Sequence, residues 1–480
     1  MGDTGGFSHI YTKNAYNYHH SPLLRSLIIR LAGRSLVWVE GEKEHKRMRS
    51  VVAPAFSSDN IREMHADIYL VATALQTRIE NEIHASDKSS IQVNILDYTS
   101  RATMDIIGRV AFGHDFNAVG DAPDVIEIAR LWRTQNEMSC KHSAFISTLV
   151  LRLFPSITSL PLPNFQAQVA VSDTIRNLAK DMVANSQVDN KGSGKDLMSL
   201  LLQANARQHK SKRPNMPEIY DHIVTFMYAA IFCSCRISCA ILINFLHSLA
   251  GNESTSLTLG FTTWALAQHP DIQTKLREEA RTIAGEPTYD DLMDPNRLPY
   301  LDAVCKEAMR MFPAGPRTEK IVEEDDVIPL RDPIRGADGS WIKSIPVKKG
   351  QVIHIPLIGI NRDEAVFGDA DVFRPTRWLV GRGDATEAKY CTSGEHGIPP
   401  SEHMCRGWSG LSTFSEGPRI CVGMKLALFE YKAILTILVR SFRFHDTGVA
   451  ISMFSGTTLS PHVKGREYEG INLPVKLTLI

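Results

Sequence analysis

Residues 414–423 read FSEGPRICVG and run directly into residues 424–442, where apolar side chains recur every three or four positions. That periodicity predicts a helix beginning just after Gly423. Cys421 therefore stands at the expected start of a helix, where unpaired backbone N–H groups and the positive end of the helix dipole lower the pKa of a thiol. Such a cysteine is suited to bind a metal or to act as a nucleophile. The alternative is a buried free cysteine beside a helix cap.

Three residues near Cys421 indicate what kind of ligand the site binds. Gly417 permits a tight turn before the cysteine, and Gly423 has no side chain, so a flat macrocycle can approach the backbone closely. Arg419 offers fixed cationic donors to a carboxylate of that macrocycle. This combination suits a haem iron held by one axial thiolate, a ligand that donates electron density to the iron and favours splitting of bound dioxygen.

The same phrase resembles the haem-binding signature of the cytochrome P-450 monooxygenases at each defining position: Phe414, Gly417, Arg419, Cys421 and Gly423. Five fixed residues at fixed spacing are a specific signal. The resemblance implies the cytochrome P-450 fold, mainly α with a small β portion, as a single domain over residues 1–480. It also implies haem b, iron protoporphyrin IX, as the cofactor, with Cys421 as the axial ligand of the iron.

The composition excludes several other classes of protein. The chain has 480 residues, of which 43% are hydrophobic and 22% charged, a globular composition with enough length for a large core. Its 53 Lys plus Arg balance its 53 Asp plus Glu, so no overall field recruits nucleic acid. Eight cysteines are too few for a disulfide scaffold and fit a reducing compartment.

Helical periodicity dominates the rest of the chain. Apolar residues recur at three- and four-residue intervals over residues 61–82, 122–134, 173–185, 196–206, 257–283 and 300–312. Alternating apolar and polar positions predict strands at 351–358 and 471–480. Two stretches without periodicity, 332–340 and 381–409, predict loops. We find no internal repeat and no linker between two independent cores.

Further segments match the same family in its order along the chain. Glu307 and Arg310, inside a predicted helix, resemble the family's Glu-x-x-Arg pair, and residues 373–378 (FRPTRW) resemble its Phe-x-Pro-Glu-Arg-Trp segment. The resemblance implies that Arg377 completes a buried triad with Glu307 and Arg310, which supports the haem-side core. Thr376 replaces the family's usual Glu, outside the triad.

The Glu-x-x-Arg pattern alone carries little weight, because other copies occur at Glu44/Arg47, Glu127/Arg130 and Glu278/Arg281. At those copies an ordinary ion pair on a helix face is expected. The flanking segments select the copy at Glu307.

Residues 41–49 (GEKEHKRMR) resemble the family's C helix, where an aromatic residue or His and an Arg four positions later reach the haem propionates. His45 and Arg49 are four positions apart and share a helix face. The resemblance therefore makes both of them candidates for haem binding. The alternative is a solvated basic helix face.

Residues 250–255 (AGNEST) resemble the part of the family's I helix that lies over the iron, where an acid and an alcohol deliver protons to bound oxygen. Glu253 and Ser254 take those two positions and are the predicted catalytic residues. Ser254 replaces the usual Thr, so it keeps the hydroxyl but loses the methyl group that restricts the rotamer. The alternative is a polar stripe on a surface helix.

About 21 residues, 228–248 (YAAIFCSCRISCAILINFLHS), separate two segments that adjoin in the family. We interpret them as an in-frame retained intron. A transcript whose mature message encodes all of them would exclude that hypothesis. The rival interpretations are a membrane-spanning segment over residues 223–250 and a metal site formed by Cys233, Cys235 and Cys239.

The beginning of the chain differs from the family pattern. The C-helix motif starts only about 41 residues into the sequence, so we expect the family's membrane anchor, hinge and first strands to be missing. Residues 1–35 contain no signal peptide or anchor helix. The residues of the motifs resemble those of fungal microsomal members of the family, which implies that the full-length form is located at the endoplasmic reticulum membrane.

The resemblance implies a monooxygenase that inserts one oxygen atom from O2 into an apolar organic substrate. The electrons would come from an NADPH-cytochrome P-450 reductase, because no nucleotide-binding glycine loop follows a strand here. Secondary metabolism of terpenoid-like compounds or xenobiotic oxidation is the expected role. A non-catalytic haem-binding remnant stays open, as does an oxygen-independent isomerase or dehydratase, against which the pair Glu253 and Ser254 argues. A membrane interaction protein would leave the phrase around Cys421 unexplained.

Overall fold

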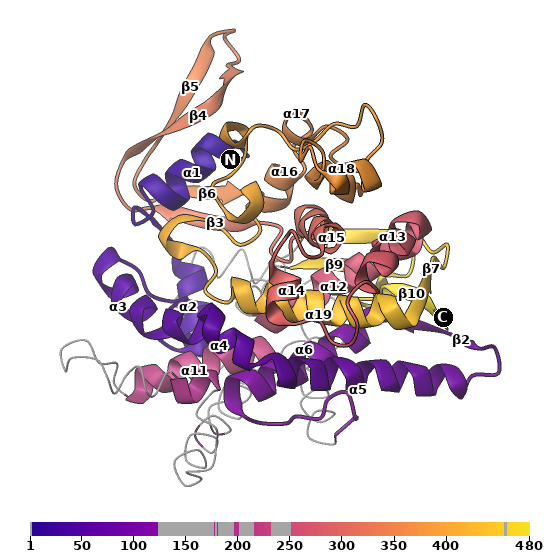
Figure 1. Ribbon diagram of the computed structural model, residues 1–480. Coiled ribbons are helices and arrows are strands. Elements are labelled where there is room, and N and C mark those ends of the chain that lie inside the picture. The colour runs from indigo at the N-terminus through magenta and orange to yellow at the C-terminus, as the bar shows by residue number, and fades with distance from the viewer. Residues whose placement is uncertain are drawn as a thin grey trace.

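The computed structural model describes residues 2–122, 177, 180, 196–200, 216–231, 251–455 and 458–480. Helices form most of its regular structure, so the prediction of a mainly α protein with a small β portion is confirmed (Figure 1). The longer helices are α2 Pro22–Ala32, α3 Glu42–Val52, α5 His65–His84, α6 Ile95–Phe112, α11 Met216–Ile231, α12 Gly251–Gln268, α13 Pro270–Ala280, α15 Pro299–Met311 and α19 Met424–Ser441. Shorter ones are α1 Thr4–Ser8, α4 Ser58–Glu63, α14 Tyr289–Met293, α16 Leu357–Asn361, α17 Glu364–Phe367 and α18 Ala385–Tyr390.

The strands form small antiparallel sheets at several places in the molecule. Two of the sheets have three strands each, β1 Tyr18–His19, β3 Thr318–Val322 and β6 Val352–Ile355 in one, and β2 Ser90–Asn94, β10 Pro474–Leu479 and β7 Phe442–His445 in the other. Two are hairpins, β4 Asp326–Arg335 with β5 Trp341–Val347 and β8 Ile451–Ser455 with β9 Leu459–Val463. The β4–β5 hairpin extends away from the helical body (Figure 1).

The observed helix boundaries differ from those predicted by the periodicity where the backbone cannot continue as a helix. The stretch 257–283 is two helices, because Pro270 lacks an N–H and begins α13 after a break at His269. The stretch 61–82 is also divided, with α4 ending at Glu63 and α5 beginning at His65. Most residues of the predicted helices at 122–134, 173–185 and 196–206 lie outside the described residues.

Two strand predictions are confirmed and both loop predictions are partly wrong, since α18 lies inside the predicted loop 381–409. Strand β10 lies within 471–480 and β6 within 351–358, although α16 already begins at Leu357. The predicted loop 332–340 is instead the end of a hairpin: β4 continues to Arg335, and only five residues turn before β5. The alternation in β4 is weak because most of its residues are exposed.

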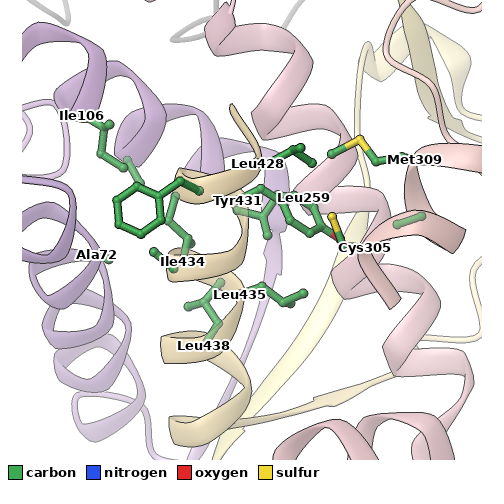
Figure 2. Packing of buried hydrophobic residues seen from close by; sticks show 14 of the residues in the cluster. Ala72, Ile106, Leu259, Cys305, Met309, Leu428, Tyr431, Ile434, Leu435 and Leu438 are labelled. Carbon is green, nitrogen blue, oxygen red and sulfur yellow. The ribbon is translucent and has the colours of Figure 1, made fainter. Parts of the chain in front are cut away.

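Helix α19 lies at the centre of the core. Figure 2 shows its residues Leu428, Tyr431 and Ile434 between Ala72 and Ile106 on one side and α15 on the other. Polar contacts fix the same packing: the Tyr431 hydroxyl lies 2.7 Å from the Thr262 hydroxyl of α12, and Lys432 Nζ donates to Asp302 Oδ1 of α15 over 2.7 Å. The loop that precedes α19 is thereby held against the rest of the core.

Candidate functional site

A cavity of about 390 Å³ lies at the N-terminal end of α19, beside Cys421. Its walls come from α6, α11, α12, the segment before α3, and the loops that follow α15 and precede α19. Apolar side chains supply a large part of that surface: Leu36, Phe56, Ile107, Met309, Leu357 and Leu426. The surface of the cavity is mainly apolar, which is typical of a site for a small organic molecule, and several hydroxyl-bearing and charged side chains also line it.

The loop 414–423 folds back on itself and presents Cys421 to this cavity. Ser415 and Gly417 both have positive φ angles, 62° and 66°, and the Cys421 N–H donates to the Phe414 carbonyl over 2.9 Å. The thiol forms part of the cavity wall, so it is surrounded by protein while its surface faces open space. Helix α19 begins three residues later, at Met424.

The pKa of the Cys421 thiol differs from the value expected at a helix start. Burial raises it above the ordinary thiol value, and the N–H groups of Gly423 and Met424, together with the charge of Arg49, lower it only in part. The helix start alone therefore does not make a thiolate here. A metal cation bound to the sulfur would remove the proton, because its charge is larger and closer than that of the backbone dipoles.

The two glycines of the loop serve different purposes. A Cβ on Gly417 would lie 2.2 Å from the carbonyl oxygen of Tyr11, so this glycine allows two backbone segments to touch. A Cβ on Gly423 would meet nothing closer than a ring atom of Phe56 at 3.8 Å. The absence of a side chain at Gly423 therefore leaves space beside Cys421 in which a flat ligand fits.

We expect Gly417→Ala to destabilise the fold, by at least about 2 kcal/mol, since alanine is strained at this φ angle and its Cβ would collide with the Tyr11 backbone. Gly423→Ala is the matched control and should leave the free energy of unfolding of the cofactor-free protein nearly unchanged. Chemical denaturation of both variants measures this difference. Equal destabilisation would contradict the separate roles of the two glycines.

Arg419 is held in a buried cluster with Glu40, His20 and Lys320, called the Arg419 cluster below. Arg419 Nη2 donates to Glu40 Oε2 over 2.6 Å, and the other Glu40 oxygen accepts from the backbone N–H and from Nδ1 of His20 over 2.8 and 2.6 Å. Burial raises the pKa of Glu40, but the His20 hydrogen bond and the nearby cations outweigh it and hold that pKa at about 2. Glu40 is therefore ionised.

The Arg419 cluster carries an excess of positive charge. Burial and the neighbouring Arg419 lower the pKa of Lys320 to about 8, so the amine is still mostly protonated at neutral pH. Burial and Lys320 lower the pKa of His20 to about 4, so His20 is neutral. Two cations thus face one carboxylate, and Nε of Arg419 is buried without a hydrogen-bond partner. This arrangement favours binding of a further carboxylate.

His45 and Arg49 lie on α3, close to the same loop. His45 is buried, with Nδ1 3.1 Å from the Tyr16 hydroxyl, and burial together with Arg419 lowers its pKa to about 4. Arg49 is half-buried and donates to the carbonyl of Ile420 over 2.8 Å. The alternative of a solvated basic face is therefore wrong for His45, whereas Arg49 contacts the cysteine loop itself.

The structure brings Glu307, Arg310 and Arg377 together in a site fully closed to solvent. Glu307 accepts from Arg310 over 2.9 and 3.0 Å and from Arg377 Nε over 3.0 Å. The same carboxylate accepts from Trp378 Nε1 over 2.9 Å and from the Arg374 N–H over 2.9 Å. The guanidinium groups also donate to a ring of backbone carbonyls, those of Asn361, Phe367, Gly368, Asp369, Ala370 and Val372.

The segment expected to lie over the iron is the first turn of α12. Ser254 and Thr255 both line the cavity that contains Cys421. Glu253 belongs to the same helix, and its backbone alone is described. The alternative of a surface stripe is wrong for Thr255, which is buried.

A sequence model of the cytochrome P-450 family matches residues 7–247 and 240–464. The chain belongs to the cytochrome P-450 family. As a member it is a monooxygenase, and the cofactor of the family is haem with an axial cysteine thiolate. The mainly α architecture with small sheets is the cytochrome P-450 fold.

Fungal cytochrome P-450 monooxygenases are among the similar curated proteins. The chain is 26% identical over 487 residues to cytochrome P-450 monooxygenase claQ of Ampulloclitocybe clavipes, an alignment that covers 99% of this chain and 83% of the relative. It is 29% identical over 463 residues to cytochrome P-450 monooxygenase 91 of Postia placenta, covering 92% of this chain and 78% of the relative.

The residues present at the cavity fit the family's haem. The buried, unpartnered Nε of Arg419 and the excess positive charge around it suit a propionate. The open space beside Gly423 suits a flat ring, and the thiol of Cys421 lies in the same wall. Arg419, Cys421 and Gly423 all line the cavity, and apolar side chains supply much of the remaining surface.

The sequence motifs did not predict the roles of several residues in this cytochrome P-450. Glu40, about 380 residues before Arg419, accepts a hydrogen bond from it. Lys320, about 100 residues before Arg419, lies close to it. Neither residue belongs to one of the family's motifs. Trp378 belongs to the motif at residues 373–378, but the motif did not predict that its indole N–H donates to Glu307. Lys320 carries no local signal, because the burial pattern of β3 does not alternate and the preceding Glu319 is also buried.

The remaining predictions concern the insert and the membrane. Most of residues 228–248, with Cys233, Cys235 and Cys239, lies outside the described residues. Within the described part of the chain, no helix is long and apolar enough to cross a membrane, and no group of three metal-ligating side chains occurs. At Glu44 and Arg47 the expected helix-face ion pair is present, at 2.5 Å.

Proposed function

We propose that this cytochrome P-450 inserts one oxygen atom from O2 into an apolar small molecule, using electrons from an NADPH-cytochrome P-450 reductase. The observation that carries the proposal is the mainly apolar cavity into which Cys421, Ser254 and Thr255 all face. An apolar wall with a few hydroxyl groups would hold a hydrophobic molecule by burial rather than by charge.

Each residue of the site has a defined task in this proposal. Cys421 would hold the haem iron, Arg419 and Lys320 would face the carboxylates, and His45 and Arg49 would support that end of the site. Bound haem supplies the activation of dioxygen, for which a thiolate ligand donates electron density. The hydroxyl of Ser254 would pass protons from Glu253 toward the cavity, and the apolar wall would exclude water from the reacting atoms.

The fungal relatives and the family support a proposal for the setting of this protein. We propose an endoplasmic reticulum membrane location for the full-length form and a role in secondary metabolism or xenobiotic oxidation, with terpenoid-like compounds as the substrate class. The cytochrome P-450 monooxygenases of Ampulloclitocybe clavipes and Postia placenta support the fungal type.

Turnover with labelled oxygen tests the proposed reaction. The holoprotein, a reductase and NADPH are incubated under oxygen-18 gas with a panel of terpenoids. We expect one labelled oxygen atom in the product. A product that forms without O2 would identify an isomerase or dehydratase instead, and a haem-loaded protein that consumes neither NADPH nor O2 would be a non-catalytic remnant.

We also propose that residues 228–248 are an in-frame retained intron within the cytochrome P-450 sequence. The two segments matched by the family model meet at residues 240–247, inside this stretch, which supports an interruption there. Its three cysteines and apolar composition differ from the polar pattern of the adjoining segments. Sequencing the transcript across the region tests the proposal, since a mature message that encodes the whole stretch would contradict it.

A further inference from the structure

Three residues of the cavity wall carry a buried polar atom that has no hydrogen-bond partner in the described part of the chain: Arg419 at Nε, Ser415 at Oγ and His222 at Nε2. The first two belong to the loop 414–423, which also carries Cys421. His222 lies on α11 instead, and its side chain is 2% exposed. The contacts assigned to haem therefore leave the unpartnered nitrogen of His222 unexplained.

The other ring nitrogen of His222 has a partner, and that partner fixes where the ring carries its proton. The Leu36 N–H donates to Nδ1 over 3.4 Å, so Nδ1 is an acceptor and carries no proton. Burial lowers the pKa of His222 to about 4, and the charge of Arg47 adds to this effect, so the ring is neutral at neutral pH. A neutral imidazole has one N–H, which here belongs to Nε2. Nε2 is therefore a hydrogen-bond donor without a described acceptor.

Several hydroxyl groups of the wall are already used as donors. They donate to backbone carbonyls, and they belong to Thr103, Thr225, Thr258 and Thr413. Their protons are therefore not offered to a molecule in the cavity. Outside the loop 414–423, His222 is the one described wall residue with a buried polar atom that has no partner.

A buried N–H group without an acceptor is unfavourable for folding, because the group has lost its hydrogen bonds to water. The packing of α11 against α6 and α12 needs no N–H at this position. A molecule in the cavity that accepts a hydrogen bond from Nε2 would remove the penalty. Such exceptions to the pairing of buried polar groups occur most often at functional sites.

We propose that His222 selects substrates that carry a neutral oxygen atom, as in a ketone, and holds that oxygen through its Nε2–H. This inference rests on the proposed monooxygenation and narrows the substrate to an apolar molecule that already contains oxygen. The neutral ring brings no charge to balance a carboxylate, so it discriminates against an acid at this position. In a mainly apolar wall, one such hydrogen bond fixes the orientation of the bound molecule.

Infrared spectroscopy of the holoprotein tests the hydrogen bond without turnover. The probe is menthone, a monoterpenoid ketone, used with and without carbon-13 in its carbonyl group so that the difference spectrum isolates that group. A hydrogen bond weakens the carbonyl double bond, so we expect the stretching band of bound menthone at a lower frequency than in hexane. His222→Phe should return the band to its position in hexane, whereas His222→Gln keeps an N–H donor and should keep the band lowered. A band at the hexane position in the parent holoprotein would overturn the inference.

Equilibrium dialysis with the holoprotein tests the selection. The probes are two pairs of a ketone and the hydrocarbon with the same skeleton, menthone with menthane and fenchone with fenchane, together with menthanecarboxylic acid. We expect the parent to bind each ketone more tightly than its hydrocarbon and more tightly than the acid. His222→Phe should weaken binding of the ketones on the order of 10-fold, the effect of one hydrogen bond, and leave binding of the hydrocarbons unchanged. His222→Gln should restore the preference. Ketones that bind to the parent no more tightly than their hydrocarbons would overturn the inference.

His462→Phe is the matched control, because His462 is also buried with a lowered pKa but does not line the cavity. It should leave both the carbonyl band and the preference for ketones unchanged. Equal losses of preference in His462→Phe and His222→Phe would overturn the inference. The band of the parent holoprotein decides the question even where a substituted chain does not fold. A holoprotein that prefers ketones but shows no O2-dependent turnover with reductase and NADPH would contradict the proposed function alone.

Discussion

Replacing Glu307 by alanine should prevent the chain from folding into a form that binds haem. Arg310 and Arg377 both have fully buried side chains, and Glu307 is the carboxylate that pairs with each of them. Its loss would leave two buried cations without a counter-charge, and would also leave Trp378 Nε1 without its acceptor. Breaking a buried charge network by removing one partner typically costs about 3–5 kcal/mol. Soluble yield, haem content and the free energy of unfolding measure the effect.

The other copy of the pattern on α3 provides the control. Glu44 and Arg47 have the same spacing, but Glu44 is 43% exposed, so their ion pair is screened by solvent. Glu44→Ala should change the free energy of unfolding by less than about 1 kcal/mol. A folded, haem-binding Glu307→Ala protein, or similar effects of the two substitutions, would contradict the assignment of the triad.

Cys421→Ser should abolish the thiolate-type absorption of the reduced, carbon monoxide-treated protein and its NADPH-dependent activity. The hydroxyl of serine is a much weaker ligand for iron than a thiolate and does not donate comparable electron density. The fold should remain, because Cys421 faces the cavity rather than the core and its backbone N–H still bonds to Phe414. The absorption spectrum and thermal unfolding of the variant check both parts.

Cys391→Ser is the control for losing a thiol. Cys391 is half-buried and does not line the cavity, so this variant should keep the absorption band. A Cys421→Ser protein that retains the thiolate-type band would require a different cysteine as the ligand and would contradict the assignment of the site.

The parts of the fold that the sequence predicted well are those fixed by local pattern. The helix after Gly423 and the helix that carries Glu307 were predicted within a residue or two, because apolar residues recur at helical spacing along both of them. The break at Pro270 is also a local property, yet the periodicity continues across it and conceals the division. The family was inferred from the residues and spacing of the motifs, and not from the prediction of individual helices and strands.

The remaining features of the site depend on packing between distant segments. Arg419 was predicted to meet a carboxylate, but the sequence gives no sign that Glu40 holds it or that Lys320 lies beside it. The pKa of Cys421 was predicted from its position at a helix start, whereas burial in the cavity has the larger effect.

The most direct test is the carbon monoxide difference spectrum of the reduced protein, recorded for the chain as written and after deletion of residues 228–248. We predict a red-shifted Soret band of the thiolate type, which shows that Cys421 holds haem in the cavity. A band that appears only after the deletion would agree with the site and with the interpretation of these residues as an insert. Absence of the band from both proteins would contradict the account of the cavity as a haem-thiolate site.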